Sequence, residues 1–218
     1  MNNLVMKDLR LGVHPMFYLL PVLTGALMLI PGWIYFMVIL YFFCITVPNM
    51  FGGWKSQNDL MFTAMMPVTK QDIVKARLTV IVILELLHIG IAMLFGQLTL
   101  HLYPDMIYYF FAPYMGFWGL CFVMLAIFNL AFIPIYYKTA YKYGSATTAG
   151  ILFATIFAGI AQWIGIQNSF VYDTFNGSGS ANTALQLSIL AVGIAIFIAC
   201  TVIAYRMAVR RLLQVEIL

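Results

Sequence analysis

The sequence predicts an all-α integral membrane protein. Of its 218 residues, 64% are hydrophobic and only 8% are charged, and its mean hydropathy is +0.97. Soluble domains of this length do not sustain such values, because about a quarter of their residues are charged. The apolar residues gather in blocks, and the chain has room for six helices of roughly 20 residues each, the length that crosses a bilayer. We therefore predict six transmembrane helices.

The first fourteen residues predict a short amphipathic helix in the membrane surface, an elbow before the first span. Its apolar positions recur at helical spacing and its basic positions lie on the opposite side: Val5, Leu9 and Val13 against Lys7, Arg10 and His14. The expected domains are this elbow helix at 1–14 and a single six-helix transmembrane domain at 15–218.

The six predicted spans follow the apolar blocks in order. They cover residues 15–30, 33–51, 76–100, 106–135, 145–166 and 183–205. The tight Pro31–Gly32 turn makes the first two spans antiparallel neighbours. In the fourth span, Pro113 and Gly116 are the expected kink. An outer loop of polar and small residues is expected at 167–182.

Small residues recur at every fourth position in the fifth span and at every third or fourth position in the sixth. Such ridges let membrane helices approach closely, either within one chain or between subunits. They comprise Ala146, Gly150, Ala154 and Ala158 in the fifth span, and Ala184, Ser188, Ala191, Ala195 and Ala199 in the sixth.

The basic residues predict the orientation of the chain. All eleven Lys and Arg residues fall on one side of the six predicted spans, and the other side keeps two acids, Asp105 and Asp173. Lysine and arginine concentrate in cytoplasmic loops. Both termini, and the loop between spans 2 and 3, are therefore expected in the cytoplasm. Because these residues stand singly or in pairs, they do not indicate a nucleic-acid partner.

The segment 56–70, between spans 2 and 3, is the candidate interaction site. Ser56 with Asp59 predicts a capping box, so a helix is expected from about Gln57 until Pro67 ends it. Thr69 with Asp72 predicts a second helix that continues into span 3. The first helix is apolar nearly all round, which is typical of a partner surface. The alternatives are that it lies flat on lipid headgroups or folds back on its own bundle.

Glu85 and His88 are the candidate polar residues inside the membrane. They stand three positions apart in span 3, so they share one helix face, and an intramembrane carboxylate is costly. Three roles are open: a local hydrogen-bonded pair or the lining of a wet cavity, a proton relay, and a contact with substrate or with a second subunit.

The sequence lacks the motifs that hydrolyse nucleotides or peptide bonds. It has no GxxxxGK[ST] phosphate loop, no HExxH, no Gly-x-Ser-x-Gly and no Asp-rich metal motif. We therefore expect no catalytic residue, no metal and no cofactor in this chain. Any energy source must lie in another subunit.

Residues 58–77, NDLMFTAMMPVTKQDIVKAR, resemble the cytoplasmic segment of small ABC-2-type transporter permeases, in which the pattern N-D-x-x-[FL]-x-x-x-[LM]-P-V-x-[KR]-x-[DE]-I-V-x-[AS]-[KR] precedes span 3. In that family the short helix is the coupling helix, which docks into a separate ATPase subunit. The resemblance implies that coupling falls on residues of this helix, with Lys70 near the docking surface: Asn58, Asp59, Leu60, Phe62, Met65 and Pro67.

The resemblance also implies the assembly and its cargo. Two permease chains, either two copies of this chain or this chain with a paralogous permease, would work with two ATPase subunits that bind ATP and magnesium. Such a protein is a multi-pass protein of the bacterial plasma membrane and not itself an enzyme. Within the family it is most similar to permeases of phenol-soluble-modulin and antimicrobial-peptide exporters, which implies export of amphipathic peptides or similar hydrophobic substrates.

Two alternatives act without an ATPase. One is a proton-coupled secondary transporter, which would need a pH-dependent role for Glu85. The other is a membrane sensor or immunity protein that binds a soluble partner through residues 56–70 and moves nothing.

Overall fold

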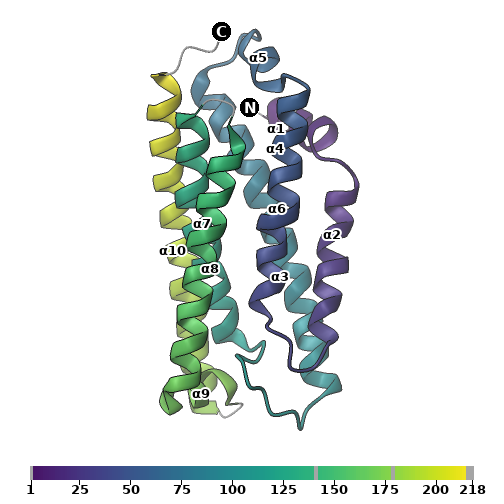
Figure 1. Cartoon of the computed structure of the whole chain (residues 1–218), viewed down its shortest axis with the longest axis vertical. Helices are drawn as coiled ribbons and strands as arrows, with labels where there is room; N and C mark the ends of the chain where they lie inside the picture. Colours follow the sequence, from purple (N-terminus) through teal and green to yellow (C-terminus); the bar gives the residue numbers. More distant parts are fainter. Residues whose placement is uncertain (1, 140–141, 178–179, 215–218) are drawn as a thin grey trace.

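Figure 1 shows the computed structural model of the chain, which describes residues 2–139, 142–177 and 180–214. Within these ranges the chain is an elongated bundle of helices with no strand, which confirms the all-α prediction. Five helices are long and apolar enough to cross a membrane. They are Phe36–Ser56, Lys70–Leu102, Met115–Lys138, Tyr143–Gln167 and Asn182–Leu213.

The first predicted span is a shorter apolar helix. It consists of α2 (Met16–Gly25) and the 3₁₀ turn η2 (Ala26–Leu29), and together they measure roughly 23 Å at the usual rise of each helix type. The hydrocarbon core of a bilayer is about 30 Å thick. The structure therefore supplies five full-length helices and one short one for the six expected spans.

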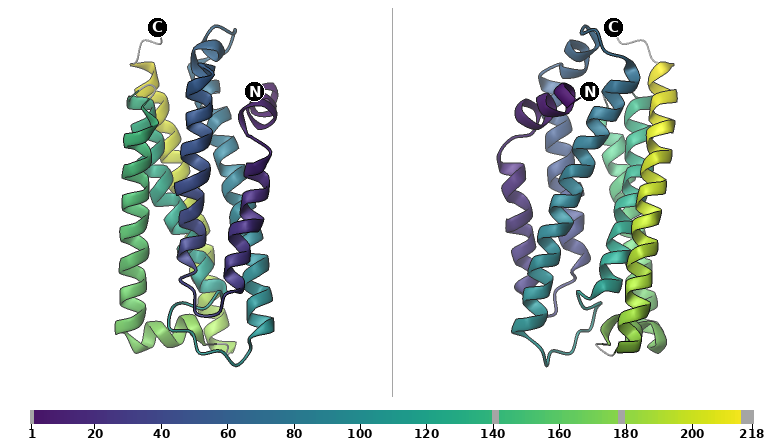
Figure 2. Two further views of the ribbon diagram at one scale, coloured as in Figure 1. Left: turned by 45° about the vertical axis from the view of Figure 1, so that its right-hand side comes forward. Right: turned by 180° about the vertical axis from the view of Figure 1, so that it is seen from behind.

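The N-terminal helix lies across one end of the bundle (Figure 2). It consists of α1 (Asn2–Lys7) and a π-helical turn, η1 (Asp8–Gly12). Its apolar side faces the other helices, because Leu4 and Val13 are buried. A helix is thus present where the elbow is expected.

The second span is one continuous helical run with a wider turn in its middle. It comprises α3 (Phe36–Tyr41), the π turn η3 (Phe42–Thr46) and α4 (Val47–Ser56). Pro48 stands in the first turn of α4. Because a proline has no N–H and its ring crowds the preceding turn, the regular ladder is interrupted here, and the π turn makes room for the ring.

The remaining long helices are α6 (Lys70–Leu102), α7 (Met115–Lys138), α8 (Tyr143–Gln167) and α10 (Ser180–Leu213). Both α8 and α10 pack against α7. At the contact with α10 the two backbones meet directly, since a Cβ added to Gly193 would lie 2.3 Å from the Gly119 carbonyl oxygen. The small residues of α8 are likewise buried inside the chain, whereas the predicted ridge of α10 is exposed.

The fourth span begins later than the sequence predicts. We expected it from Met106, but residues 103–114 form a loop and α7 begins at Met115. Pro113 forces Ala112 out of the helical region, and the Ala112 N–H donates to the Asn176 side chain at 2.7 Å. Asn176 ends α9 (Ser169–Asn176), a helix within the expected outer loop that the sequence analysis did not predict.

The core between the second span and α7 contains stacked aromatic rings. Phe43 and Phe128 stack with their ring centroids 3.9 Å apart, and Phe132 continues the stack 5.2 Å beyond Phe128. α8 fits closely against this stack because its residue 150 is glycine, where a Cβ would lie 2.7 Å from the Phe128 ring. This packing holds the end of the bundle at which the candidate site lies.

Candidate functional site

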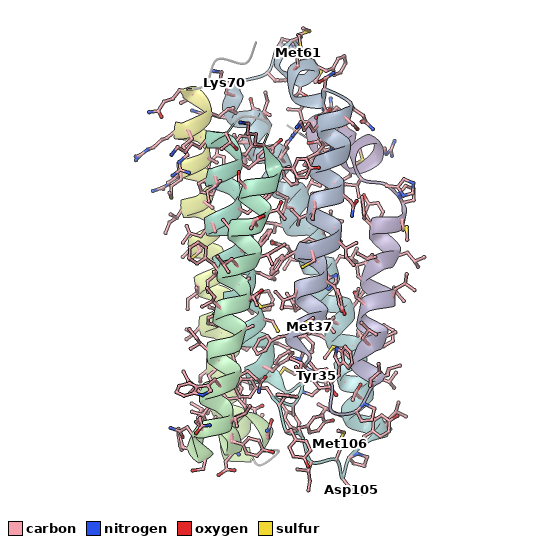
Figure 3. The ribbon with its side chains drawn as sticks, in the orientation of Figure 1. Tyr35, Met37, Met61, Lys70, Asp105 and Met106 are labelled. Carbon is pink, nitrogen blue, oxygen red and sulfur yellow. The ribbon has the colours of Figure 1, made fainter. Side chains whose placement is uncertain are left out.

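The candidate site is built on α5 (Asp59–Ala64), a short helix between α4 and α6 at one end of the bundle (Figure 1). In Figure 3, Met61 and Lys70 lie at this end, and Asp105 and Met106 lie at the opposite end. The N-terminal helix and the last turns of α10 also lie at the end of α5. The site is therefore exposed beyond the membrane-crossing part of the bundle.

The start of α5 differs from the prediction. α4 continues through Ser56, whose Oγ donates to the Gly53 carbonyl at 2.8 Å, so Ser56 is not an N-cap. The chain instead turns at Asn58, which has φ +50°. Asparagine tolerates this left-handed conformation better than most residues. The Ser56–Asp59 capping box was therefore wrong, and α5 is shorter than the expected helix.

The second capping prediction is confirmed in its main contact. α6 begins at Lys70 with Thr69 as its N-cap. The Thr69 Oγ1 accepts from the Asp72 N–H at 3.1 Å, and the same hydroxyl donates to the Asp72 carboxylate at 2.6 Å. Lys70 reaches across to the last turns of α10, where its Nζ donates to the Leu212 carbonyl at 3.3 Å.

α5 has a polar inner side and an apolar outer side. Asp59 and Thr63, four positions apart, face the bundle, and Thr63 is 3% exposed. Phe62 is 61% exposed, Met65 71% and Met61 41%. These three residues are defined here as the apolar patch. The side chains of Leu60 and Ala64 lie outside the described part of the structure. The apolar patch does not fold back on the bundle, which removes that alternative.

Two cations hold Asp59. Lys7 Nζ, from the N-terminal helix, donates to Asp59 Oδ1 at 2.8 Å and to Thr63 Oγ1 at 2.8 Å. Arg77, from the second turn of α6, donates through Nη2 to Asp59 Oδ2. Lys7 also lies 3.2 Å from the Asp8 carboxylate. Lys7, Asp8, Asp59 and Arg77 are called the ion-pair cluster below.

Arg77 is buried and contacts Asp59, Tyr136 and Trp54. It is 2% exposed, and its guanidinium lies over the Trp54 ring with Cζ 4.4 Å from the ring centroid. Its Nη1 donates to the Tyr136 hydroxyl at 3.2 Å. A buried cation without partners is strongly destabilising, so these contacts are needed to keep Arg77 inside the protein. Through Arg77 the ion-pair cluster is joined to α4 and α7.

Asp8 is the less stabilised acid of the ion-pair cluster. It is 3% exposed. Burial raises the pKa of its carboxyl above the ordinary value of 3.8, although the charges of Arg77 and Lys7 act in the opposite direction. The buried carboxylate form of Asp8 is therefore disfavoured relative to the same group in water.

Glu85 and His88 lie inside the bundle but do not pair with each other. Glu85 is fully buried and accepts at Oε2 from Asn129 Nδ2 of α7 at 2.9 Å. His88 Nε2 lies 2.9 Å from the Val38 carbonyl of α3. The Val38 carbonyl is available to His88 because the Phe42 N–H, next to the π turn, donates to the Ile39 carbonyl instead. The expected Glu85–His88 pair is thus replaced by two links to different helices.

Three buried polar atoms in this region have no hydrogen-bond partner: Glu85 Oε1, His88 Nδ1 and Asn129 Oδ1. The arrangement can orient α6 relative to α3 and α7. Unpaired buried polar atoms also mark a site where a proton or a polar group could bind. The local Glu85–His88 pair is not formed, whereas the lining of a wet cavity, a proton relay, and a contact with substrate or with a second subunit stay open.

An apolar hollow of about 330 Å³ lies between α3 and α8. Phe36, Met37, Leu40 and Trp163 contribute to its lining, together with the polar side chain of Gln162. Its chemistry suits a hydrophobic group with few polar atoms.

Sequence reasoning missed the residues that position the site. Lys7 was interpreted as a polar-side residue of the elbow helix and Arg77 as the last residue of the family pattern, and both as marks of membrane orientation. Trp54 and Asn129 were not singled out. Asn129 offered a signal, because it is a lone polar residue inside the apolar run of the fourth span. The partners of Lys7 and Arg77 offered none, since Lys7 and Asp59 are 52 positions apart.

Comparison with known protein families gives one result. The family described as "ABC-2 family transporter protein" matches residues 3–211, nearly the whole chain. No curated protein and no solved structure is significantly similar to the chain.

Proposed function

Because the chain belongs to the ABC-2 family of transporter proteins, we propose that it is the permease subunit of an ATP-driven exporter and that its ATPase docks on α5. Members of this family are membrane subunits that work with an ABC ATPase. The observation that carries the proposal is the apolar patch on α5, with Phe62 and Met65 more than half exposed at the end of the bundle.

The patch has the properties of a docking surface. Large apolar side chains are rarely left exposed in a group at the water-facing end of a protein, and aromatic residues and methionine are enriched at the centres of interfaces. The ion-pair cluster holds the inner side of α5, so the patch is presented on a fixed support. Asn58, Asp59 and Pro67 then shape the element, while Phe62 and Met65 make the contact.

The contacts that hold α5 also couple its movement to that of α6. Asp59 pairs with Arg77 of α6, and Thr69 caps the start of that helix. Closure of two ATPase subunits would move α5, and this movement would tilt α6 against the other helices. A path for substrate would open between two permease chains, each providing six membrane-crossing segments, with Met16–Leu29 as the shortest.

The charge distribution supports a cytoplasmic position for α5. The Lys and Arg residues lie in the N-terminal helix, around α5, at the end of α7, just before α8 and at the end of α10. All lie at the end of the bundle that carries α5, and Asp105 lies at the other end (Figure 3). By the positive-inside tendency, the α5 end and both termini would face the cytoplasm of a bacterial cell.

The proposed cargo is an amphipathic peptide or a similar hydrophobic substrate. Two observations support it: the similarity of residues 58–77 to permeases of peptide exporters, and the apolar hollow between α3 and α8. ATP and magnesium would be bound by the ATPase, and the chain itself would have no catalytic residue.

The test is to purify the chain in mild detergent from its own host and identify associated proteins by mass spectrometry. The proposal predicts an ATPase subunit with a phosphate loop, lost in Phe62→Asp and retained in Ser145→Asp. Ser145 is exposed in the first turn of α8, so this control adds the same charge at the same end of the bundle. Failure of any ATPase to associate with the intact wild-type chain would favour a secondary transporter or sensor.

A further inference from the structure

We infer that the N-terminal helix, α1 with η1, holds α5 in the orientation that presents the apolar patch, and that Lys7 is the positioning residue. The inference rests on the proposed docking role of α5, and it adds a third element to the docking unit. The sequence pattern places this helix in the membrane surface with Lys7 on its outer side. The structure instead directs Lys7 into contact with α5.

Lys7 makes the contacts that an ammonium group requires. Its N–H donors bond to Asp59 Oδ1 and Thr63 Oγ1 at 2.8 Å each, and Asp8 Oδ1 lies 3.2 Å from Nζ as an ion-pair contact without a hydrogen bond. Asp59 and Thr63 stand four positions apart, so they lie one above the other on a single face of α5. The Lys7 side chain therefore bonds to both polar residues of that face.

α5 depends on such contacts because it has little stability of its own. It contains six residues, and its N-cap residue makes no side-chain hydrogen bond to the helix. Isolated helices of this length do not persist in water. The orientation of Phe62 and Met65 must therefore come from tertiary contacts of the inner face.

The contacts come from two directions. Arg77 of α6 holds one oxygen of Asp59, and Lys7 of the N-terminal helix holds the other. Thr63 is held by Lys7. Loss of Lys7 would leave Arg77 as the cation that holds Asp59 and would remove the hydrogen bond to Thr63, so the inner face of α5 would be less firmly oriented. A load applied to the apolar patch would then reach α6 less directly.

The N-terminal helix is itself fixed to the bundle. Gly12 lies against Trp54, where a Cβ would come within 2.1 Å of the indole Nε1, and Trp54 carries Arg77 on its ring. Val13 is buried beside this contact. The N-terminal helix and α6 thus share Trp54 as a common support, and Lys7 extends from that support to α5.

The test compares Lys7→Met with Arg10→Met by hydrogen exchange of the full-length chain in lipid nanodiscs. Both variants lose one cation from the same helical segment, but Arg10 is exposed. Exchange is measured at the backbone amides of Phe62 and Met65, which donate to the carbonyls of Asn58 and Met61 within α5. Because hydrogen bonds to charged groups are lost, we expect about tenfold less protection in Lys7→Met. Arg10→Met is expected to match the wild type.

Two further measurements keep the result interpretable. Amides of α7 must keep wild-type protection in Lys7→Met, which shows that the bundle is folded. Thr63→Val, which keeps the shape of the side chain but removes one acceptor, should lower α5 protection by a smaller factor. Wild-type protection of α5 in both Lys7→Met and Thr63→Val would overturn the inference.

Measuring how the ATPase binds to these variants distinguishes failure of the inference from failure of the proposed function. If the wild-type chain binds the ATPase, Lys7→Met should weaken binding and Lys7→Arg should restore most of it, since Arg supplies the same charge. If the wild-type chain binds no ATPase, the proposed function fails. The exchange data then still decide whether the N-terminal helix holds α5.

Discussion

Asp59 is the residue at which the candidate site is joined to the rest of the protein. Its two carboxylate oxygens receive hydrogen bonds from different elements, one from Lys7 and one from Arg77. The family resemblance identified Asp59 as a coupling residue. The structure places it on the inner face of α5, where it pairs with Lys7 and Arg77, whereas Phe62 and Met65 are exposed on the outer side.

Asp8 makes stability depend on pH. Burial raises the pKa of its carboxyl above 3.8, so the folded chain binds more protons than the unfolded chain as pH rises from 3.8 to the folded pKa. Stability from this group is therefore lost as pH rises through that window. Asparagine does not titrate, so Asp8→Asn does not lose stability in this way. The thermal midpoint of the variant minus that of the wild type should therefore increase from pH 4 to pH 7. A difference between the two proteins that is independent of pH would contradict this account.

Glu85 gives a prediction about the buried polar region. Glu85→Gln keeps an oxygen for Asn129 Nδ2 and adds an N–H for the unpaired Asn129 Oδ1, so stability should change by less than about 1 kcal/mol. Glu85→Ala leaves Asn129 without its partner and opens a cavity, at a cost of about 2–4 kcal/mol. Chemical unfolding in detergent measures both. Equal losses in the two variants would show that an amide cannot replace the carboxyl group of Glu85.

The same pair of variants separates the roles of Glu85 in transport. If Glu85 only orients α6, transport by Glu85→Gln should equal wild type at every pH. Transport that loses its pH dependence in Glu85→Gln would support the proton-coupled alternative, because glutamine cannot exchange a proton.

At the scale of elements, α7 and α10 are joined by a contact that admits no side chain. A Cβ at Gly193 would lie 2.3 Å from the Gly119 carbonyl oxygen, and backbone atoms cannot move aside as a side chain does. Gly193→Ala should therefore destabilise the protein by about 1–3 kcal/mol. Gly159 of α8 has nothing within 4 Å of an added Cβ, so Gly159→Ala should be neutral or slightly stabilising. Equal effects in thermal unfolding would refute the close α7–α10 contact.

The elements show where sequence reasoning succeeds and where it stops. Long apolar blocks predicted the positions of α6, α8 and α10 because burial in a membrane demands a continuous apolar helix. The loop 103–114 was misread because it is as apolar and aromatic as a span. Pro113 keeps Ala112 out of the helical region, and Asn176 and Tyr172 of the distant helix α9 bond to the backbone of the loop, contacts that the sequence does not reveal. The left-handed turn at Asn58 was missed because Ser56 and Asp59 fit a capping box equally well by spacing.

At the scale of the whole molecule, the membrane class and the family were accessible from the sequence, and the support of the site was not. Composition and the residues 58–77 led to an ABC-2 permease, which the family match over residues 3–211 confirms. The ion-pair cluster could not be predicted, since it joins three segments far apart in the chain. Which residues dock and which residues hold the docking helix is thus decided by the fold.

The central claim is that an ATPase binds the apolar patch of α5. The most direct measurement is the dissociation constant of the purified ATPase for the chain in nanodiscs, compared among wild type, Phe62→Asp and Ser145→Asp. Loss of a central aromatic contact costs about 2 kcal/mol or more, so Phe62→Asp should raise Kd by roughly thirtyfold or more, and Ser145→Asp should leave it unchanged. An unchanged Kd in Phe62→Asp would show that the ATPase does not bind through the apolar patch of α5.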